Sequence, residues 1–331
     1  MRSTEYQHRC LDKESPVRIS QVVGPRTSVI VDEPDPVPGP REVLVEVLAS
    51  GVCTSDLGAW RDHDASRPAL RLGHEVAGRI VATGEEAGGW QVGDVVTGLG
   101  GPGFASRTLL DAGSLALVPA GFAPEHALGE PIANLVDAVA RSPIVPGARV
   151  AVVGMGFMGL GLVQLVHATG PSSLVAVDTK PAAHRRALAM GADAAYTPDE
   201  LPEQFRTAPA PGEADGRFDV VIEAAGATPA LTLAGSLVRP YGTLTVVGYH
   251  HDGTAPMDLE LWYKAVTIVN GFCPSRRRLT AALVDGIDQV SRHRFDYAPL
   301  ITHKFGLEGV DDAFALMESR PADFVKSVVL P

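Results

Sequence analysis

The sequence predicts an α/β protein of two domains, a small β-barrel followed by a doubly wound parallel sheet. The first observation is the length, because 331 residues are enough for about two domains of ordinary size. The second is a series of short alternating strands that runs to about Val118, separated by Gly, Pro and Asp. The third is a change after this point to apolar strands that alternate with helices, as in parallel sheets.

In the N-terminal part we expect short strands in a closed or nearly closed barrel. Residues 1–16 show no periodicity and are expected to form a disordered leader. Apolar and polar residues then alternate in segments bounded by turn residues. The proline-rich segment 34–40 is expected to be an exposed, extended connector. The expected strands cover residues 17–23, 28–34, 42–52, 75–84 and 94–100.

After about Pro119 the pattern becomes that of a doubly wound sheet. Residues 124–142 have a helical pattern, with prolines near the start. From about residue 300 the chain returns to strand, helix and strand. In between, we expect strands at 149–153, 174–177, 218–223, 243–248 and 265–271, and helices at 157–169, 181–190 and 229–238.

The composition argues against nucleic-acid and membrane partners. Lys and Arg number 28 against 39 Asp and Glu, a formal net charge of −11 that would repel a phosphate backbone. No stretch approaches the ~18 uninterrupted apolar residues of a membrane span, and the N-terminus lacks the apolar core of a secretory signal. The cysteines at positions 10, 53 and 273 are too few for a disulfide framework. We therefore expect a cytoplasmic protein.

A glycine-rich turn between a predicted strand and a predicted helix is the first candidate site. Its sequence, GMGFMG at 154–159, matches the dinucleotide pattern G-x-G-x-x-G. The first glycine permits the tight turn, the second lets backbone approach a pyrophosphate, and the third lets the helix pack on the strand. A turn that serves packing alone is the alternative. We expect cofactor contacts from Gly154, Gly156, Phe157, Met158 and Gly159, because the helix start offers free N–H groups to phosphate.

Asp178 completes this pattern, 19 residues past the last glycine and at the end of the strand LVAVD. Its carboxylate can bind the adenosine ribose and would repel a 2′-phosphate, so NAD is favoured over NADP. Lys180 and Arg185 lie close enough in sequence to weaken this argument, and Lys180 is counted among the cofactor contacts. Ala225 and Gly248, near the ends of two later strands, are expected to line the same site.

A thiol, an imidazole and two carboxylates form the second candidate site. Cys53 follows a predicted strand, His74 and Glu75 begin another, and Glu130 precedes a proline. Taken singly, each has an ordinary structural explanation, such as a buried cysteine or a core histidine. Together, thiolate and imidazole ligands suit zinc, and a catalytic zinc takes three protein ligands and keeps one open position.

These motifs in combination resemble the zinc-containing medium-chain alcohol dehydrogenases. G-V-C-x-S-D at 51–56, G-H-E at 73–75 and G-D-V-V at 93–96 precede the glycine turn in the order and spacing of that superfamily. The resemblance covers residues 17–331. The Glu-Pro pair at 130–131 is similar to the branch of polyol, glucose and threonine dehydrogenases.

The resemblance implies a domain organisation, a cofactor set and an assembly. A chaperonin-10-like β-barrel catalytic domain would comprise residues 17–135 and 296–331, and a Rossmann domain that binds NAD would comprise 136–295. One catalytic zinc ion and the nicotinamide would lie in the cleft between them. A homodimer or homotetramer would form through the edge of the Rossmann sheet, here residues 265–271.

The resemblance also assigns roles to residues. Cys53 and His74 would bind zinc, and Glu75 would be a ligand or an adjacent carboxylate that exchanges with water. Glu130 would bind zinc directly or through water. Ser55 would contact the substrate hydroxyl and start its proton towards solvent, and Asp56 would orient the site.

The chain departs from many relatives in two ways. Residues 93–113 contain no cysteine, so the lobe that holds a structural zinc is absent. The histidine that ends the proton relay in many relatives is replaced by Gly58, so Ser55 must pass its proton to the cofactor ribose, to water, or to another group such as His63. Trp60, Arg61 and His63 are assigned equally to the substrate cleft and to an ordinary surface loop. The histidine pair at 250–251 follows a predicted strand end near the expected position of the nicotinamide, but it is interpreted as a solvated loop.

The sequence thus predicts a zinc-dependent oxidoreductase that transfers hydride between a secondary alcohol and NAD. The alcohol would belong to a polyol, sugar, cyclitol or related hydroxylated metabolite. An amino-alcohol or threonine-type dehydrogenase is the first alternative. A zinc-free quinone or enoyl reductase and a nicotinamide-binding sensor without catalysis are the others.

Overall fold

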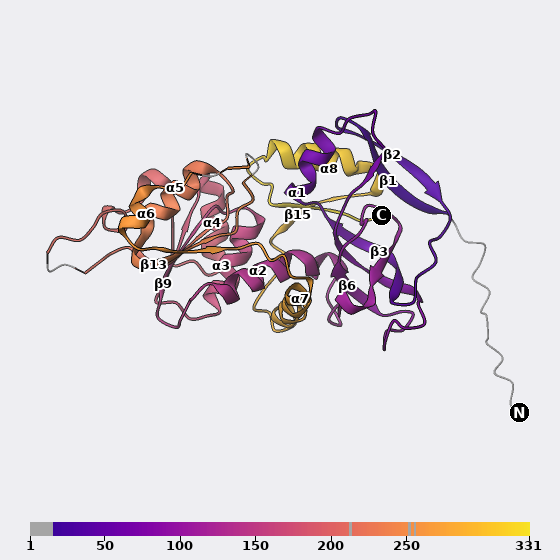
Figure 1. Cartoon of the computed structure of the whole chain (residues 1–331), viewed down its shortest axis with the longest axis horizontal. Coiled ribbons are helices and arrows are strands. Elements are labelled where there is room, and N and C mark those ends of the chain that lie inside the picture. The colour runs from indigo at the N-terminus through magenta and orange to yellow at the C-terminus, as the bar shows by residue number, and fades with distance from the viewer. Residues whose placement is uncertain (1–15, 212–213, 251–252, 255) are drawn as a thin grey trace, which may run out of the picture.

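The computed structural model of the chain describes residues 16–211, 214–250, 253–254 and 256–331 (Figure 1). The leader expected at residues 1–16 therefore lies outside the described residues, except for Pro16.

The N-terminal part and the C-terminal segment share one mainly antiparallel β-structure. Its helices are α1 (Thr54–Arg61) and α8 (Val310–Ser319). Its strands are β1 (Val17–Gly24), β2 (Thr27–Glu33), β3 (Glu42–Gly51), β4 (Leu70–Arg71), β5 (Glu75–Thr83), β6 (Val95–Leu99), β7 (Arg107–Asp111), β8 (Leu115–Leu117), β15 (Ile301–Phe305) and β16 (Lys326–Val329).

Strand β3 is the centre of this structure, because it pairs antiparallel with β5, β7 and β16. The larger sheet has the order β15-β16-β3-β5-β6-β8, with β7 also on β3, and β2-β1-β4 form a second sheet. Alternate residues of β3, Val43, Val45 and Val47, are buried in one core with Ile80 of β5, which accounts for the alternation in the sequence. Because β16 pairs with β3, the end of the chain reaches the strand that leads into Cys53.

The middle of the chain forms a six-stranded parallel sheet with the order β11-β10-β9-β12-β13-β14. Counted along the chain this is 3-2-1-4-5-6, the order of dinucleotide-binding folds. The strands are β9 (Arg149–Val153), β10 (Ser173–Val177), β11 (Ala194–Tyr196), β12 (Phe218–Glu223), β13 (Val238–Val246) and β14 (Thr267–Asn270). The helices are α2 (Gly129–Arg141), α3 (Phe157–His167), α4 (Pro181–Ala189), α5 (Thr228–Leu237), α6 (Leu259–Tyr263) and α7 (Arg276–Ser291).

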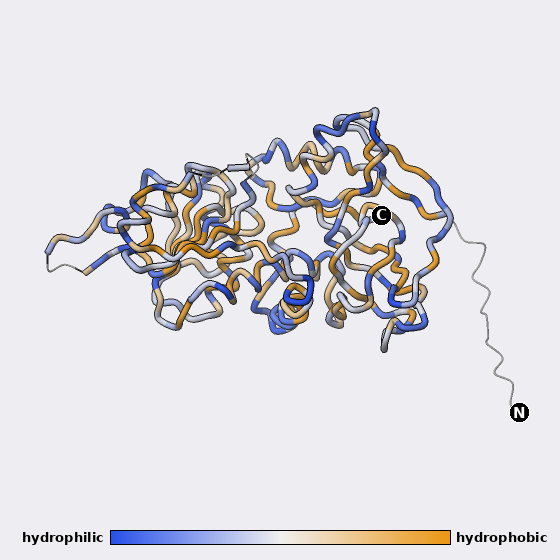
Figure 2. The backbone as a smooth tube through the Cα atoms, in the orientation of Figure 1, coloured by the Kyte–Doolittle hydropathy of each residue, from blue (hydrophilic) through white to orange (hydrophobic). Residues whose placement is uncertain are grey.

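The inner strands of this sheet are apolar because both of their faces are covered (Figure 2). Val150 and Val152 of β9 belong to a core shared with α2, α3, α4 and α7, whereas Ala151 and Val153 face α5 and α6. The first core also includes Ala49 of β3, so one apolar cluster runs from the parallel sheet into the antiparallel part. Among the described residues, no helix combines the length and the apolar character needed to cross a bilayer.

Candidate metal and cofactor site

Three candidate ligands from distant segments meet where β5 and α1 begin. Cys53 lies between β3 and α1, His74 precedes β5, and Glu75 is the first residue of β5. The antiparallel pairing of β3 and β5 places Gly51 opposite Glu75 and so brings Cys53 to the same end. The sulfur, one ring nitrogen and one carboxylate oxygen of these three residues all lie within 4.8 Å of one another.

The carboxylate of Glu75 is buried and only half satisfied. The residue is 1% exposed, and its Oε1 accepts a hydrogen bond of 2.6 Å from Lys326 Nζ. Its Oε2 has no hydrogen-bond partner within the described part of the chain. A Cβ at Gly51 would lie 1.8 Å from Oε2, so only glycine leaves room for this oxygen. A buried carboxylate oxygen without a donor is costly, and a bound cation would satisfy it.

Lys326, which the sequence reasoning missed, connects the two candidate sites. Its ammonium group is buried and lies 4.5 Å from the ring centroid of Phe157, the first residue of α3. Burial by itself would lower the pKa of Lys326, but the negative charges of Glu75 and Cys53 outweigh it and raise the pKa. The available signal was one lysine inside the apolar segment FVKSVVLP.

His74 is held by an acid on α1. Its Nδ1 lies 3.2 Å from Asp56 Oδ2, and its Nε2 lies 3.5 Å from Ser55 Oγ. The hydroxyl of Ser55 also donates to Cys53 Sγ at 3.3 Å. Burial by itself would lower the pKa of His74, but hydrogen bonds to Asp56 and Cys53 outweigh it and raise the pKa to about 11. Asp56 thus fixes the ring through Nδ1 and leaves Nε2 for a ligand.

Glu130, in the first turn of α2, lies near these three residues but outside their group. Asn134 Nδ2 donates to its Oε1 at 2.7 Å. Burial, followed by the charge of Glu75, raises the pKa of Glu130 to about 7. The structure therefore brings three of the four expected ligands together and keeps the fourth within electrostatic range.

The donor set of Cys53, His74 and Glu75 fits zinc. Sulfur, imidazole nitrogen and carboxylate oxygen are the ligand types that this ion takes in proteins. Glu75, whose Oε2 lacks a donor, belongs to this group of residues. Cys273 is also a free thiol, but it lies outside the group of potential ligands.

The glycine turn has the steric features that its sequence indicates. Gly154 has φ +96°, and a Cβ there would lie 2.7 Å from Ala225 N. A Cβ at Gly159 would lie 1.7 Å from the Gly154 carbonyl oxygen, so α3 packs directly on the turn. At Gly156 a Cβ would meet nothing within 4 Å, which leaves this backbone open to a ligand. At the same sheet edge, Phe157 and Met158 form the start of α3, Ala225 follows β12, and Gly248 follows β13.

Asp178 lies directly after β10 and reaches the glycine turn. Its Oδ2 accepts from Met155 N at 2.7 Å, and its Oδ1 accepts from Lys180 N at 2.8 Å. The side chain of Lys180 extends to the antiparallel part, where Nζ donates to the Arg320 carbonyl at 2.9 Å, just beyond α8. Arg186 of α4 donates to two further carbonyls of the same loop.

Two secondary expectations need correction. Trp60 lines no cleft and no surface loop: it is 2% exposed, stacks on Phe314 at 5.2 Å and donates to Asp311 at 2.7 Å. His250 is not solvated, because its side chain is 13% exposed and its Nε2 lies 3.1 Å from Glu223 Oε2. His251 lies outside the described residues.

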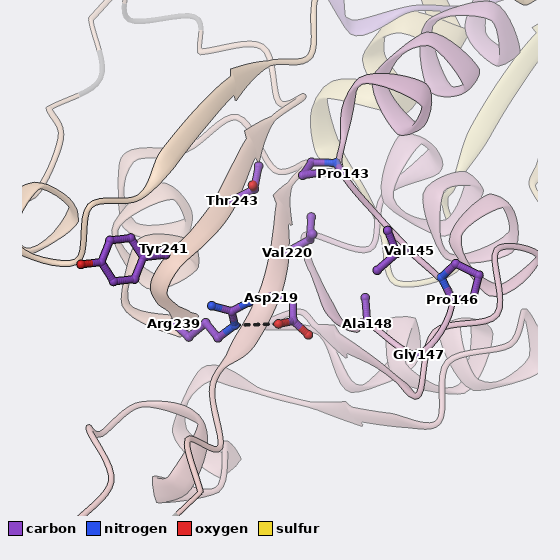
Figure 3. A pocket seen from close by; sticks show the side chains of 10 residues that line it. All are labelled: Pro143, Val145, Pro146, Gly147, Ala148, Asp219, Val220, Arg239, Tyr241 and Thr243. Atoms are coloured by element: carbon purple, nitrogen blue, oxygen red, sulfur yellow. Dashed lines mark hydrogen bonds and ion pairs between the residues drawn. The ribbon is translucent and has the colours of Figure 1, made fainter.

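A cavity of about 390 Å³ lies at the opposite edge of the parallel sheet (Figure 3). Asp219, near the start of β12, accepts from Arg239 at 2.6 Å on its rim. Because dinucleotides bind at the carboxyl ends of the strands, this cavity does not belong to the candidate site. Its lining residues are Pro143, Val145, Pro146, Gly147, Ala148, Asp219, Val220, Arg239, Tyr241 and Thr243.

Comparison with known proteins agrees with this geometry. Residues 39–120 match the family model of the alcohol dehydrogenase GroES-like domain, and residues 158–289 match that of zinc-binding dehydrogenases. L-threonine 3-dehydrogenase of Pyrococcus horikoshii is 30% identical over 88% of this chain and 92% of that protein. Sorbitol dehydrogenase of Halalkalibacterium halodurans is 26% identical over 91% of this chain and 95% of that protein. NADP-dependent isopropanol dehydrogenase of Thermoanaerobacter brockii is 28% identical over 91% of this chain and 96% of that protein.

Among solved structures, 2R,3R-butanediol dehydrogenase of Bacillus subtilis aligns with a TM-score of 0.80 at 22% identity, over 95% of this chain and 99% of that one. A Rossmann sheet joined to a GroES-like domain defines a dehydrogenase architecture, which confirms the predicted fold class. The chain belongs to the zinc-containing medium-chain alcohol dehydrogenase family. Its predicted enzyme class, an alcohol dehydrogenase, is thereby confirmed, and zinc and a nicotinamide cofactor are supported.

Proposed function

We propose that this enzyme transfers hydride between a secondary alcohol of a polyol, sugar, cyclitol or related hydroxylated metabolite and NAD. One zinc ion would be held by Cys53, His74 and the carboxylates of Glu75 and Glu130. The observation that carries the proposal is the position of Lys326. Its ammonium group contacts Glu75 of the potential metal group and Phe157 of the glycine-turn helix, so metal and dinucleotide chemistry would share one site.

The side chains suggest how the reaction would proceed. When bound, zinc supplies a positive charge that lowers the pKa of an alcohol hydroxyl, and the nicotinamide ring exchanges hydride. Ser55 is exposed and lies beside Cys53 and His74, so its hydroxyl can accept the substrate proton while it passes its own proton to the cofactor ribose or to water. Asp56 keeps the His74 ring in one orientation. Lys326 offsets the negative charge that Glu75 and the Cys53 thiolate would otherwise concentrate there.

The preference for NAD over NADP rests on Asp178. Two backbone N–H groups fix its carboxylate beside the glycine turn, where its remaining lone pairs can accept from ribose hydroxyls. A 2′-phosphate would meet this negative charge. The NADP-dependent isopropanol dehydrogenase relatives make the choice of cofactor a direct experimental question.

Oxidation of an amino alcohol such as threonine is the second candidate function, favoured by the 30% identity to L-threonine 3-dehydrogenases. The experiment measures zinc content and then the formation of NADH with polyols, cyclitols, sugars and L-threonine. A higher turnover rate with the hydroxylated metabolites than with L-threonine supports the first proposal. A correctly folded protein that holds no zinc would contradict both.

We further propose that two copies of the chain associate in the cytoplasm through β14, the outer strand of the parallel sheet. Apolar side chains on and near this edge are exposed, including Trp262 at 73%, Ile268 at 41% and Phe272 at 68%. An exposed strand edge with apolar side chains favours pairing with another chain. Light scattering of the purified protein would test the expected dimer or tetramer.

A further inference from the structure

A buried carboxylate at the carboxyl edge of the parallel sheet has no role in the chemistry described above. Glu223, the last residue of β12, is 0% exposed. Its Oε1 accepts from the backbone N–H groups of Ala225 and Gly226, each at 2.7 Å. Its carbonyl accepts from Val247 and Gly248 at 2.8 and 3.0 Å. Glu223 therefore connects the loop after β12 to the loop after β13.

The second carboxylate oxygen orients a histidine. His250 Nε2 lies 3.1 Å from Glu223 Oε2, and the imidazole is 13% exposed. A carboxylate only accepts, so Nε2 carries the proton and Nδ1 of the neutral ring is an acceptor. Within the described residues no hydrogen bond reaches Nδ1. Glu223 thus fixes an imidazole that presents one free acceptor.

The two loops adjoin the glycine turn. A Cβ at Gly154 would lie 2.7 Å from Ala225 N, and one at Gly226 would lie 2.4 Å from the Tyr249 carbonyl oxygen. The glycine turn, the loop after β12 and the loop after β13 therefore form a continuous surface at the edge where dinucleotides bind.

The position of Asp178 gives the direction of a dinucleotide on this surface. Asp178 follows β10, on one side of β9, whereas β12 and β13 lie on the other side. With the pyrophosphate on the glycine turn and the adenosine ribose at Asp178, the nicotinamide half must extend over β12 and β13. His250 lies on that side.

We propose that His250 Nδ1 accepts a hydrogen bond from the nicotinamide half of the cofactor, and that Glu223 is the positioning residue that fixes its ring. This rests on the proposed nicotinamide chemistry. The histidine would hold the reactive half of the cofactor, while Asp178 holds the adenosine half.

Fluorescence titrations of the zinc-loaded enzyme with NADH, ADP-ribose and AMP test this assignment. We expect His250→Phe to weaken NADH binding about tenfold, the value of one hydrogen bond, and to leave AMP binding unchanged. If the affinity for ADP-ribose falls in parallel, the contact lies at the nicotinamide-side ribose. If only the affinity for NADH falls, the contact lies at the nicotinamide ring. An equal fall in the affinity for AMP, or an unchanged affinity for NADH, would overturn the proposal.

Two variants separate binding from folding. Glu223→Gln keeps the size of the side chain but turns an amide N–H₂ towards His250, so the ring must accept at Nε2 and loses its free acceptor at Nδ1. We expect weaker NADH binding with AMP affinity retained, and unchanged NADH binding would contradict the role of Glu223. His293→Asn, at an exposed histidine beyond α7, is the control and should bind all three ligands normally. A wild-type enzyme that binds no NADH would instead refute the proposed function.

Discussion

Lys326 Nζ and Glu75 Oε1 lie 2.6 Å apart with both side chains buried, and these residues are 251 positions apart in the chain. Lys326 is the first residue of the last strand, β16. Glu75 is the first residue of β5, which follows the potential metal ligand His74. A buried carboxylate beside a thiol would be strongly unfavourable without this cation.

Replacement of Lys326 by Met should therefore destabilise the metal-free protein. We expect its free energy of unfolding to fall by about 3–5 kcal/mol, because a buried charge loses its partner. Urea unfolding measures this. Lys304→Met is the matched control: Lys304 pairs with Glu125 at 2.7 Å but is 49% exposed, so its loss should cost below about 1 kcal/mol. Similar losses in both variants would contradict the prediction.

Cys53→Ser should abolish zinc binding and turnover while NADH affinity survives, because the glycine turn is built from other residues. Metal analysis and NADH titration measure the two effects. Cys273→Ser, at a buried cysteine outside the group of potential ligands, should retain zinc. A sensor without catalysis would respond to cofactor equally in both variants.

Gly51→Ala should weaken zinc binding at least tenfold, because the new methyl group would lie 1.8 Å from Glu75 Oε2 and displace it. Competition with a chelator gives the affinity. Gly58→Ala is the comparison, since a Cβ in α1 at this position meets nothing within 4 Å. That variant should keep its zinc and gain about 0.5–1 kcal/mol of stability. Equal zinc affinity in the two variants would show that Oε2 is not a ligand.

The metal-free protein should lose stability as pH rises. The pKa of Glu130 is raised from 4.5 to about 7, and that of His74 from 6.5 to about 11. Groups with raised pKa values stabilise the fold below their unfolded values and lose this effect as pH rises through the folded ones. The losses therefore span about pH 4.5–7 for Glu130 and continue above pH 6.5 for His74.

Melting temperatures of metal-free protein between pH 5 and pH 9 should accordingly fall, whereas zinc affinity should rise because ligands must lose protons. Glu130→Gln should flatten the lower part of the stability profile. An unchanged slope in that variant would mean that Glu130 does not titrate in this range.

Asp178→Ser should reduce kcat/KM for NAD about tenfold or more, through loss of hydrogen bonds to the ribose, and should improve use of NADP. Initial rates with both cofactors measure this. Asp285→Ser, at an exposed acid on α7, should change neither value. An unaltered ratio of NAD to NADP use would remove the basis for the preference.

Much of this architecture could be predicted from local sequence patterns. Alternation in β3 and the apolar segment of β9 predicted their burial because these patterns follow directly from the faces that each strand presents. The glycine turn and Asp178 were predictable because their spacing reflects one strand–helix–strand unit.

Long-range contacts were not predictable in the same way. Lys326 is a single charge on an apolar strand, and only the pairing of β16 with β3 shows that it reaches Glu75. His250 was assigned to solvent because its partner, Glu223, lies on another strand and looks like an ordinary buried strand end. Helix α1 was missed because it is short and has few apolar residues.

The bond between Lys180 and the Arg320 carbonyl has a consequence for cofactor exchange. Lys180 lies two residues after Asp178, and its ammonium group already donates to a carbonyl in the antiparallel part of the enzyme. To neutralise the 2′-phosphate of NADP, Lys180 would have to leave the Arg320 carbonyl. The contact between the two parts of the enzyme would then be weaker. Acceptance of the phosphorylated coenzyme should therefore weaken the contact between Lys180 and the loop after α8 and make that loop easier to cleave by protease.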